Sequence, residues 1–472
     1  MQQLKAIKIA KIGENRGSPR IWLQGSTLDR AGFKHGTRFE VEKHATRPLL
    51  TLKQCPEGMR IVSQQVRGTR AIPVIDINSK DVLDAFASLS SVLVVVEGDV
   101  IHILPVASEL RARRRLERLA EHMLHDEPVT IGSTSSGIGV LDLAAHEGLA
   151  AEGVKSKLLL ANEIREDCME HAIARNPAYC DETVIVTAPM QELAFDRWAM
   201  DKLPEVDLFV AGIPCSGASV AGRTKRALEH PESHPDVGHL VVAYLALVAR
   251  TNPSVVVLEN VPPYRTSASM AIIRNQMRDL GYDVHEIELD AGDWNMLEHR
   301  RRMCMVAVTK GIAFSFDDLL KPAPEEHRFA EVMDQVPDDA STWGKIDYLF
   351  AKRERDKAEG KGFKPNIIGP DSTKVPTLNK SLHKRQSTGS FLPHPRDNTL
   401  YRIPTVKEHA RCKGIPEALV EDTTQTFGHE VCGQAISVPP FVSVFQLIAR
   451  ALKALGRDAA SKATFFRQGV AA

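Results

Sequence analysis

The sequence lacks the features that mark disulfide-rich, metal-bound or membrane-spanning proteins. Its seven cysteines are scattered over 472 residues without a CxxC pair, which argues against a zinc site and a disulfide framework. No apolar run approaches the roughly 20 residues that cross a bilayer. The first residues also lack the apolar block and cleavage site of a signal peptide. We therefore expect reduced thiols, no bound metal, no membrane partner and a cytoplasmic location.

An excess of one charge sign is also missing. Sixty Lys and Arg balance sixty Asp and Glu, so the whole-chain composition neither requires nor excludes a nucleic-acid partner. The stretch "SELRARRRLERLAEHMLH" (residues 108–125) is locally basic and has a helical pattern. We interpret it as a solvated connecting helix, and a phosphate-contacting face beside DNA is the alternative.

Hydrophobic periodicity divides the chain into regions with different folds. Up to about residue 107, two halves each read strand, short helical turn, strand, with "STLDRAGF" and "SKDVLDAF" in equivalent places. From Thr130, strands alternate with helices, which predicts a mostly parallel, doubly wound α/β sheet. The expected parts are an all-β barrel-like domain of two degenerate repeats (1–107), a basic helical linker (108–126), an α/β domain (127–317, resumed at 401–457), a small irregular inserted domain (318–400) and a tail (458–472).

A loop rich in glycine and serine follows the first strand of the α/β domain. "STSSGIG" (residues 133–139) lies between a predicted strand and a predicted helix, and Glu163 closes the next strand. Glycines let the backbone approach a ligand, and an acid about 25 residues further on can accept hydrogen bonds from ribose hydroxyls. The pattern indicates a site for a ribose-bearing cofactor, with a simple turn and a surface acid as the alternative.

A cysteine follows another apolar strand. In "VDLFVAGIPCSGASVAG", Cys215 comes after a proline and before a run of small residues, at the carboxyl end of the strand. Ligands bind at such ends in open α/β sheets. Cys215 is therefore expected at a ligand-binding position and not in the core, although a single Pro-Cys pair at a strand end is commonly structural.

Five motifs between residues 130 and 455 resemble, in order, those of the cytosine-5 DNA methyltransferase family. They are "GIPCSGASVAG" (212–222), "LENVPPY" (258–264), "LDAGDWNMLEHRRRMCMVAV" (289–308), "RIPTVKEHARCKGIP" (402–416) and "SVPP" (437–440). The resemblance implies a Rossmann-like methyltransferase domain in which residues 318–400 form the variable target recognition region. It also implies double-stranded DNA as the partner and S-adenosyl-L-methionine as the cofactor.

The resemblance assigns roles to individual residues. Cys215 would add to C6 of a flipped-out cytosine, Glu259 would hydrogen-bond or protonate N3, and a base inside a duplex would have to leave the stack first. Asn260 would brace the cysteine loop, and Arg302 would contact O2 of the base, with Arg300 nearby. The residues expected to bind the cofactor are Ser135, Ser136, Gly137, Ile138, Gly139, Glu163, Ile164, Pro214, Ser437 and Val438. The phosphate-contact candidates in the recognition region are Lys352, Arg353, Arg355, Lys361, Lys364, Lys380, Lys384 and Arg385, with a solvated face as the alternative.

The chain departs from the family pattern mainly on the cofactor side. Ser135 replaces the aromatic residue that flanks the adenine, "TAPMQ" lacks the usual aspartate, and Ala435 and Ile436 replace Gly-Asn. Glu298 replaces a glutamine, which we expect to add a negative charge close to DNA. Three alternatives stay open: methylation of RNA cytosine, transfer of a modified methyl group, or a non-catalytic DNA-binding regulator with an eroded cofactor pocket.

The N-terminal region carries a second resemblance. "PRIWLQGSTLDRAGFKHGTRFEVE" (residues 19–42) is similar to the SymE-like and AbrB-like swapped-hairpin barrels. This implies DNA binding or dimerisation, and we expect a homodimer through this domain. A small barrel that serves only for packing is the alternative.

Overall fold

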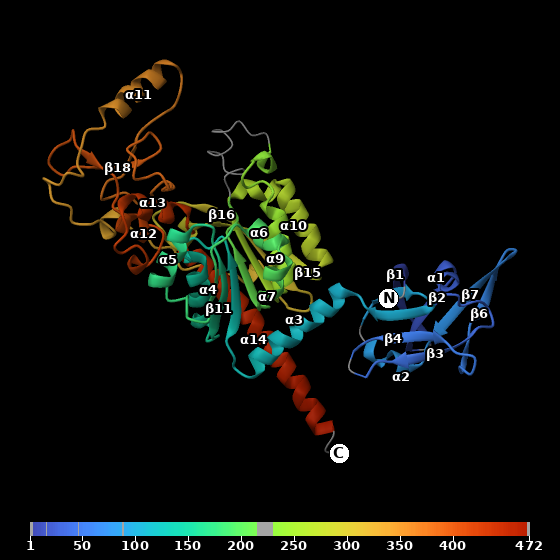
Figure 1. The fold of residues 1–472 in the computed structure, drawn as a ribbon. Helices are drawn as coiled ribbons and strands as arrows, with labels where there is room; N and C mark the ends of the chain where they lie inside the picture. The colour runs from blue at the N-terminus through green and yellow to red at the C-terminus, as the bar shows by residue number, and fades with distance from the viewer. Residues whose placement is uncertain (1–2, 16, 46, 87–88, 215–229, 470–472) are drawn as a thin grey trace. The chain divides into compact units, whose positions relative to one another are not determined.

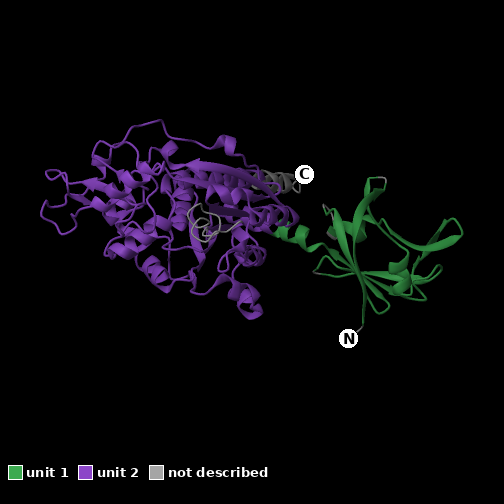
Figure 2. Ribbon diagram, turned by 90° about the horizontal axis from the view of Figure 1, so that it is seen from above, with its two compact units in different colours: residues 1–114 green, residues 115–472 purple. Residues whose placement is uncertain are grey.

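The structure is a computed structural model that describes residues 3–15, 17–45, 47–86, 89–214 and 230–469. Contacts divide the chain into two units, residues 1–114 and 115–472 (Figure 2). The unit boundary lies inside helix α3 (Ala107–Leu124). Each unit has its own hydrophobic core, and each is described by itself below.

Unit 1 (residues 1–114) contains one antiparallel nine-stranded sheet in the order β5-β3-β4-β9-β8-β1-β2-β7-β6 (Figure 1). Its strands are β1 (Leu4–Asn15), β2 (Ser18–Gln24), β3 (Arg38–Lys43), β4 (Leu50–Gln54), β5 (Arg60–Ile61), β6 (Ser63–Arg67), β7 (Arg70–Ile77), β8 (Ser91–Glu97) and β9 (Val100–Pro105). The two edge strands, β5 and β6, are separated only by the buried Val62. The sheet therefore curls until its edges nearly meet, as the all-β, barrel-like prediction required.

Two short helices pack on the core of unit 1. α1 (Ser26–Arg30) lies in "STLDRAGF" and α2 (Lys80–Leu83) in "SKDVLDAF", the two segments that the sequence placed in equivalent positions. Both segments contribute buried apolar side chains to the same cluster: Leu28, Ala31 and Phe33 from the first, and Leu83 and Phe86 from the second. Alternate residues of β8 complete the cluster, as expected for a strand with one buried face.

Unit 2 (residues 115–472) is built on a seven-stranded sheet in the order β12-β11-β10-β13-β14-β16-β15. Its strands are β10 (Val129–Thr134), β11 (Ser156–Asn162), β12 (Val184–Val186), β13 (Leu208–Ala211), β14 (Val255–Asn260), β15 (Tyr282–Asp290) and β16 (Arg301–Thr309). The first five strands in that order are parallel, and β16 runs antiparallel to both of its neighbours. The doubly wound α/β prediction is confirmed.

Helices cover both faces of this sheet. α4 (Val140–Ala151) and α14 (Val438–Gly469) pack on one face with a cluster that includes Val210 and Val306. α9 (Leu240–Thr251) and α10 (Ala268–Asp279) pack on the other face with Phe209 and Met305. Because neighbouring residues of one strand enter different clusters, the apolar runs that the sequence shows are strands buried on both sides.

The last helix differs from one expectation. By length and composition, Val438–Asp458 is long and apolar enough to cross a membrane. By this criterion, the expectation that no apolar run approaches the length needed to cross a bilayer is wrong. Half of its most apolar window is buried inside the protein, where α14 packs along α4. This helix therefore packs on the α/β core.

The segment between β16 and residue 400 is mostly irregular. It contains α11 (Asp347–Ala358), β17 (Asn366–Ile367) and β18 (Ser390–Pro393), and β18 also pairs with β19 (Tyr401–Arg402). Two small apolar clusters hold this region together. The chain then returns through α12 (Val406–Arg411) and α13 (Gln425–Gln434) to α14.

Candidate active site

The carboxyl ends of three neighbouring parallel strands, β10, β13 and β14, carry predicted site residues. A Cβ built on Gly212, just after β13, would lie 3.5 Å from Glu259 Oε2 and 3.8 Å from the carbonyl oxygen of Ser135. Glu259 is near the end of β14 and Ser135 directly follows β10. The glycine at 212 thus leaves room between the glutamate and the glycine-rich loop. Cys215 itself lies in 215–229, outside the described residues.

Glu259 and Arg302 contact each other directly. The Arg302 Nε lies 2.8 Å from Glu259 Oε1, and the two side chains are 15% and 13% exposed. They come from neighbouring antiparallel strands, β16 and β14. The resemblance assigns these two side chains to neighbouring positions of one base, N3 and O2, and in the structure they already form a pair that restrains both of them.

Asn260 fastens the segment that leads to Cys215. Its side-chain amide donates a hydrogen bond to the carbonyl oxygen of Ile213 at 3.0 Å, and its Oδ1 accepts from the backbone N–H of Val261 at 2.8 Å. Asn260 is 1% exposed. With both bonds made in a dry environment, its side chain has one orientation, and the end of β13 is tied to the end of β14.

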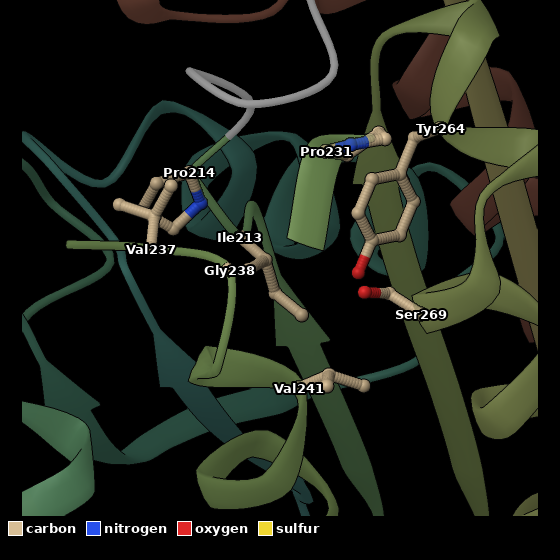
Figure 3. A pocket seen from close by; sticks show the side chains of 8 residues that line it. All are labelled: Ile213, Pro214, Pro231, Val237, Gly238, Val241, Tyr264 and Ser269. Carbon is tan, nitrogen blue, oxygen red and sulfur yellow. The ribbon is translucent and has the colours of Figure 1, made fainter. Parts of the chain in front are cut away.

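Pro214 is the last described residue before Cys215, and it borders a small hollow (Figure 3). The hollow is lined by Ile213, Pro214, Pro231, Val237, Gly238, Val241, Tyr264 and Ser269. Ile213, Val241 and Tyr264 belong to the α9 and α10 side of the core, and the hydroxyls of Tyr264 and Ser269 face each other in Figure 3. Pro214 therefore borders a hollow on this side of the core, and its predicted contact with the cofactor stays a prediction.

The glycine-rich loop has an unusual backbone. Ser135, Gly137 and Gly139 all have positive φ, at 54°, 57° and 74°. For Ser135, the left-handed conformation costs roughly 1–2 kcal/mol. Gly139 has no alternative, because a Cβ there would lie 2.6 Å from the Asn176 side chain. The loop is thus held in a defined shape directly before α4.

Glu163 holds this loop from the end of the neighbouring strand. Its Oε2 accepts the backbone N–H of Gly137 at 2.8 Å, and its Oε1 accepts the N–H of Arg165 at 3.0 Å. The glutamate is 8% exposed, whereas the side chain of the next residue, Ile164, is 62% exposed. A fixed carboxylate beside a glycine and an open apolar side chain is a suitable arrangement for a ligand with hydroxyls and a flat ring.

Sequence reasoning missed the buried Asp142 in the first turn of α4. Burial raises its pKa to about 6, although hydrogen bonds from Ser133 and Tyr179 oppose this rise. Tyr179 Oη lies 3.2 Å from Asp142 Oδ2. The pair packs under the loop, since the Tyr179 ring would meet a Cβ on Gly139 at 2.7 Å. An aspartate in an apolar helix was the available signal.

Glu298 does not add a negative charge near DNA, contrary to our expectation. It is fully buried, its Oε2 lies 2.5 Å from the Lys413 Nζ, and its Oε1 accepts the N–H of Leu378 at 2.9 Å. Burial and the nearby Arg300 lower the pKa of Lys413 to about 7, and Glu298 opposes that change. The replacement therefore creates an internal ion pair.

Arg300 belongs to this internal cluster. Its Nη2 donates to the carbonyl oxygen of Gly433 at 3.0 Å, its Nη1 lies 3.6 Å from Glu298 Oε1, and it is 4% exposed. Ser437 and Val438 adjoin the same region, because the Val438 N–H donates to the carbonyl of Lys413 at 2.8 Å. These three predicted site residues are thus grouped around Lys413, a residue that sequence reasoning did not single out.

Several phosphate-contact candidates have partners within the protein. Lys352 pairs with Asp356, Arg353 with Glu354, and Lys361 with Glu359, and Arg385 donates to the carbonyl of Thr342. Within the described ranges, no group of three or more His, Cys, Asp or Glu side chains is placed to hold a metal ion.

Comparisons with known proteins agree with this geometry. Residues 129–452 match the model of the C-5 cytosine-specific DNA methylase family, so the chain belongs to that family. The Type II methyltransferase M1.ScrFI of Lactococcus lactis subsp. cremoris is 26% identical over 260 residues, 53% of this chain and 64% of that protein. M.MspI of Moraxella sp is 27% identical over 262 residues, 54% of this chain and 59% of that protein. The matches thus span less than two thirds of these relatives.

Solved structures support the fold. The S. pombe Dnmt2 methyltransferase superposes with a TM-score of 0.53 at 20% identity, covering 69% of this chain and 99% of that one. The Entamoeba histolytica methyltransferase EhMeth gives 0.51 at 16% identity, with 69% and 98% covered. In both comparisons almost the whole known structure is matched, and about a third of this chain lies outside it.

Members of this family use S-adenosylmethionine as the methyl donor. The residues present fit that group. No atom lies within 4 Å of a Cβ built on Gly137, so the loop backbone is open on that side. The Glu163 carboxylate, held by two backbone N–H groups, keeps further lone pairs for ribose hydroxyls. The loss of the aromatic residue at Ser135 therefore changes the loop without removing its ligand-binding groups.

Proposed function

We propose that the chain is a DNA cytosine-5 methyltransferase that acts in the cytoplasm on cytosines flipped out of duplex DNA. The observation that carries this proposal is the Glu259–Arg302 pair beside Gly212, three residues before Cys215. A carboxyl and a guanidinium held together at the end of a nucleophile segment match the N3 and O2 edges of cytosine. The family match over residues 129–452 supports the same chemistry.

Each residue then has a defined task. The thiolate of Cys215 adds to C6 of the cytosine, which turns C5 into a nucleophilic carbon. Glu259 hydrogen-bonds at N3 and Arg302 at O2, where negative charge develops during the attack. C5 takes the methyl group, then loses its proton to a base, and the Cys215 thiolate leaves. Asn260 acts as a positioning residue, because it holds the Ile213 carbonyl and not the base.

Bound S-adenosylmethionine would supply the electrophilic methyl group. Glu163 would accept hydrogen bonds from its ribose hydroxyls, Ile164 would cover one face of its adenine, and the backbone from Ser135 to Gly139 would line the site. Ser437 is 3% exposed, and its hydroxyl has no hydrogen-bond partner among the described residues. This places an unused polar group at the start of α14, and we assign Ser437 and Val438 to the wall of the pocket.

For unit 1 we propose a swapped-hairpin barrel of the SymE-like or AbrB-like kind that forms a homodimer. The nearly closed antiparallel sheet and the two equivalent helical segments support this. We also propose that residues 318–400 form a recognition region inserted into a catalytic domain made of residues 127–317 and 401–457.

Transfer of a labelled methyl group tests the proposed function. Wild-type protein incubated with methyl-labelled S-adenosylmethionine and duplex DNA of varied sequence should yield 5-methylcytosine, identified after digestion to nucleosides. Cys215→Ser should abolish transfer, whereas Cys180→Ser, at an exposed cysteine, should retain it. Label found in tRNA in preference to DNA, or in neither, would overturn the proposal in favour of an RNA methyltransferase or a non-catalytic regulator.

A further inference from the structure

The balanced charge of the chain hides an unequal distribution. Unit 1 contains 18 Lys and Arg and 11 Asp and Glu, which gives a formal charge of +7. The rest of the chain contains 42 basic and 49 acidic residues, which gives −7. A polyanion is therefore attracted by unit 1 as a whole and repelled by unit 2 as a whole.

One part of unit 1 is a basic two-stranded ribbon whose side chains are exposed and do not pack into the core. Strands β6 and β7 form a hairpin in which the nine residues 63–71 are all exposed (Figure 1). Residues 58–75 include Arg60, Arg67 and Arg70 but no Asp or Glu. Val66 at the centre of β6 is 66% exposed. Packing within unit 1 does not explain an exposed hairpin of this length.

The register of the hairpin places its cations together. Arg67 and Arg70 are direct cross-strand partners, and Gln65 pairs with Ile72 next to them. Directly opposed residues share one face of a ribbon, so both arginines and Gln65 point the same way. The Arg67 Nη2 lies 3.5 Å from Gln65 Oε1. Like charges directly opposite each other destabilise a hairpin, and a bound anion would relieve that cost.

We propose that the β6–β7 hairpin is a duplex-DNA-binding ribbon, in which Arg67 and Arg70 contact phosphates and Gln65 faces the groove. A two-stranded ribbon fits the major groove, and glutamine has the donor and acceptor that adenine requires. The proposal rests on the proposed function only in taking DNA as the polymer. It gives this chain a DNA contact outside the part that matches the methylase family, residues 129–452.

The test compares two double variants of the full-length protein. Arg67→Gln/Arg70→Gln removes the paired cations, and Lys34→Gln/Lys80→Gln removes two exposed cations elsewhere in unit 1. Binding of a fluorescent 30-base-pair duplex is measured between about 50 and 200 mM salt. Loss of two phosphate contacts should reduce the slope of log K against log salt by about 1.8 and weaken binding at 0.1 M salt at least tenfold. The lysine variant should keep a slope closer to that of the wild type.

Two further readouts separate a binding role from a structural one. The thermal midpoint of the arginine variant should equal or exceed that of the wild type, because a like-charge pair is gone. Methyl transfer at saturating DNA should be unchanged, so failure of the proposed function is seen separately from failure of the ribbon. Equal salt slopes for the arginine and lysine variants, or tighter binding of an RNA hairpin than of duplex DNA, would overturn the proposal.

Discussion

At the scale of single residues, the ion pair between Glu298 and Lys413 is the clearest consequence of one substitution in a family motif. Both side chains are fully buried, and their charged atoms lie 2.5 Å apart. Such a pair adds little net stability over a neutral pair, but either charge alone is costly because water cannot reach it. The pair connects residue 298, shortly before β16, with residue 413, shortly after α12.

Lys413→Met should lower the free energy of unfolding by about 3 kcal/mol, because it removes the nearer positive partner of the buried Glu298 carboxylate and leaves Arg300, whose Nη1 lies 3.6 Å away, to balance it. The double variant Glu298→Gln/Lys413→Met should recover most of that loss. Urea denaturation measures both changes. The control is Lys53→Met, which breaks the exposed pair with Glu42 and should cost less than about 1 kcal/mol. A Lys413→Met protein as stable as the control would contradict the account.

The sequence indicated that Glu259 and Arg302 lie together, but it did not indicate where the Arg300 side chain points. Backbone geometry explains the difference. Glu259 and Arg302 are strand residues, so pairing of β14 with β16 brings them together. Arg300 is two positions from Arg302 and would share its face in an extended chain. It lies before β16 begins, however, and its side chain turns toward Glu298 and the Gly433 carbonyl. Side-chain periodicity does not apply beyond the end of a strand.

At the scale of elements, the contact between α4 and α14 depends on one glycine. A Cβ on Gly148 would lie 2.5 Å from the Phe445 Cβ and 2.6 Å from the carbonyl oxygen of Val442. A backbone atom cannot move aside cheaply, so this position requires the absence of a side chain. Gly148 thus explains how α14 lies so close to the helix that follows the glycine-rich loop.

Gly148→Ala should destabilise the protein by about 1–3 kcal/mol through overpacking. The range is the net effect, after the gain of up to about 1 kcal/mol that alanine brings to a helix interior is subtracted from the cost of overpacking. Gly362→Ala is the matched control, since a Cβ there meets no atom within 4 Å and its φ is not in the left-handed region. Chemical denaturation should show a loss for the first variant alone. Equal stability of both variants would mean that α14 does not pack on α4 in this way.

Helix α3 shows why a basic run is ambiguous in a sequence. Its pattern predicted the helix, but neither a solvated face nor a DNA contact describes Arg115 and Arg118. Arg115 is 1% exposed and donates to the Leu280 carbonyl, and Arg118 pairs with Asp207 and donates to the Asn252 carbonyl. These partners lie about 90 to 165 positions further along the chain. No local pattern reveals that the arginines attach α3 to unit 2.

At the scale of the whole molecule, the architecture of each unit was predictable, whereas the charge balance of the whole chain concealed an unequal distribution. Alternating strands gave the all-β region, and strands alternating with helices gave the doubly wound sheet, because both periods reflect which faces are buried. The boundary at residue 114 gives charges of +7 and −7, and the predicted boundary at residue 107 already gives +5 for the N-terminal domain, with 15 Lys and Arg and 10 Asp and Glu. A total of zero therefore conceals one basic unit and one acidic unit that carries the methylase fold.

The measurement that tests the central claim most directly is covalent trapping on duplex DNA that contains 5-fluorocytosine. Fluorine at C5 prevents the final loss of a proton, so an enzyme that has added its cysteine and transferred the methyl group stays attached. We expect a denaturant-stable adduct with wild-type protein and S-adenosylmethionine. The adduct should be absent without the cofactor and absent with Cys215→Ser. An adduct that persists in Cys215→Ser, or no adduct on any duplex, would contradict the account.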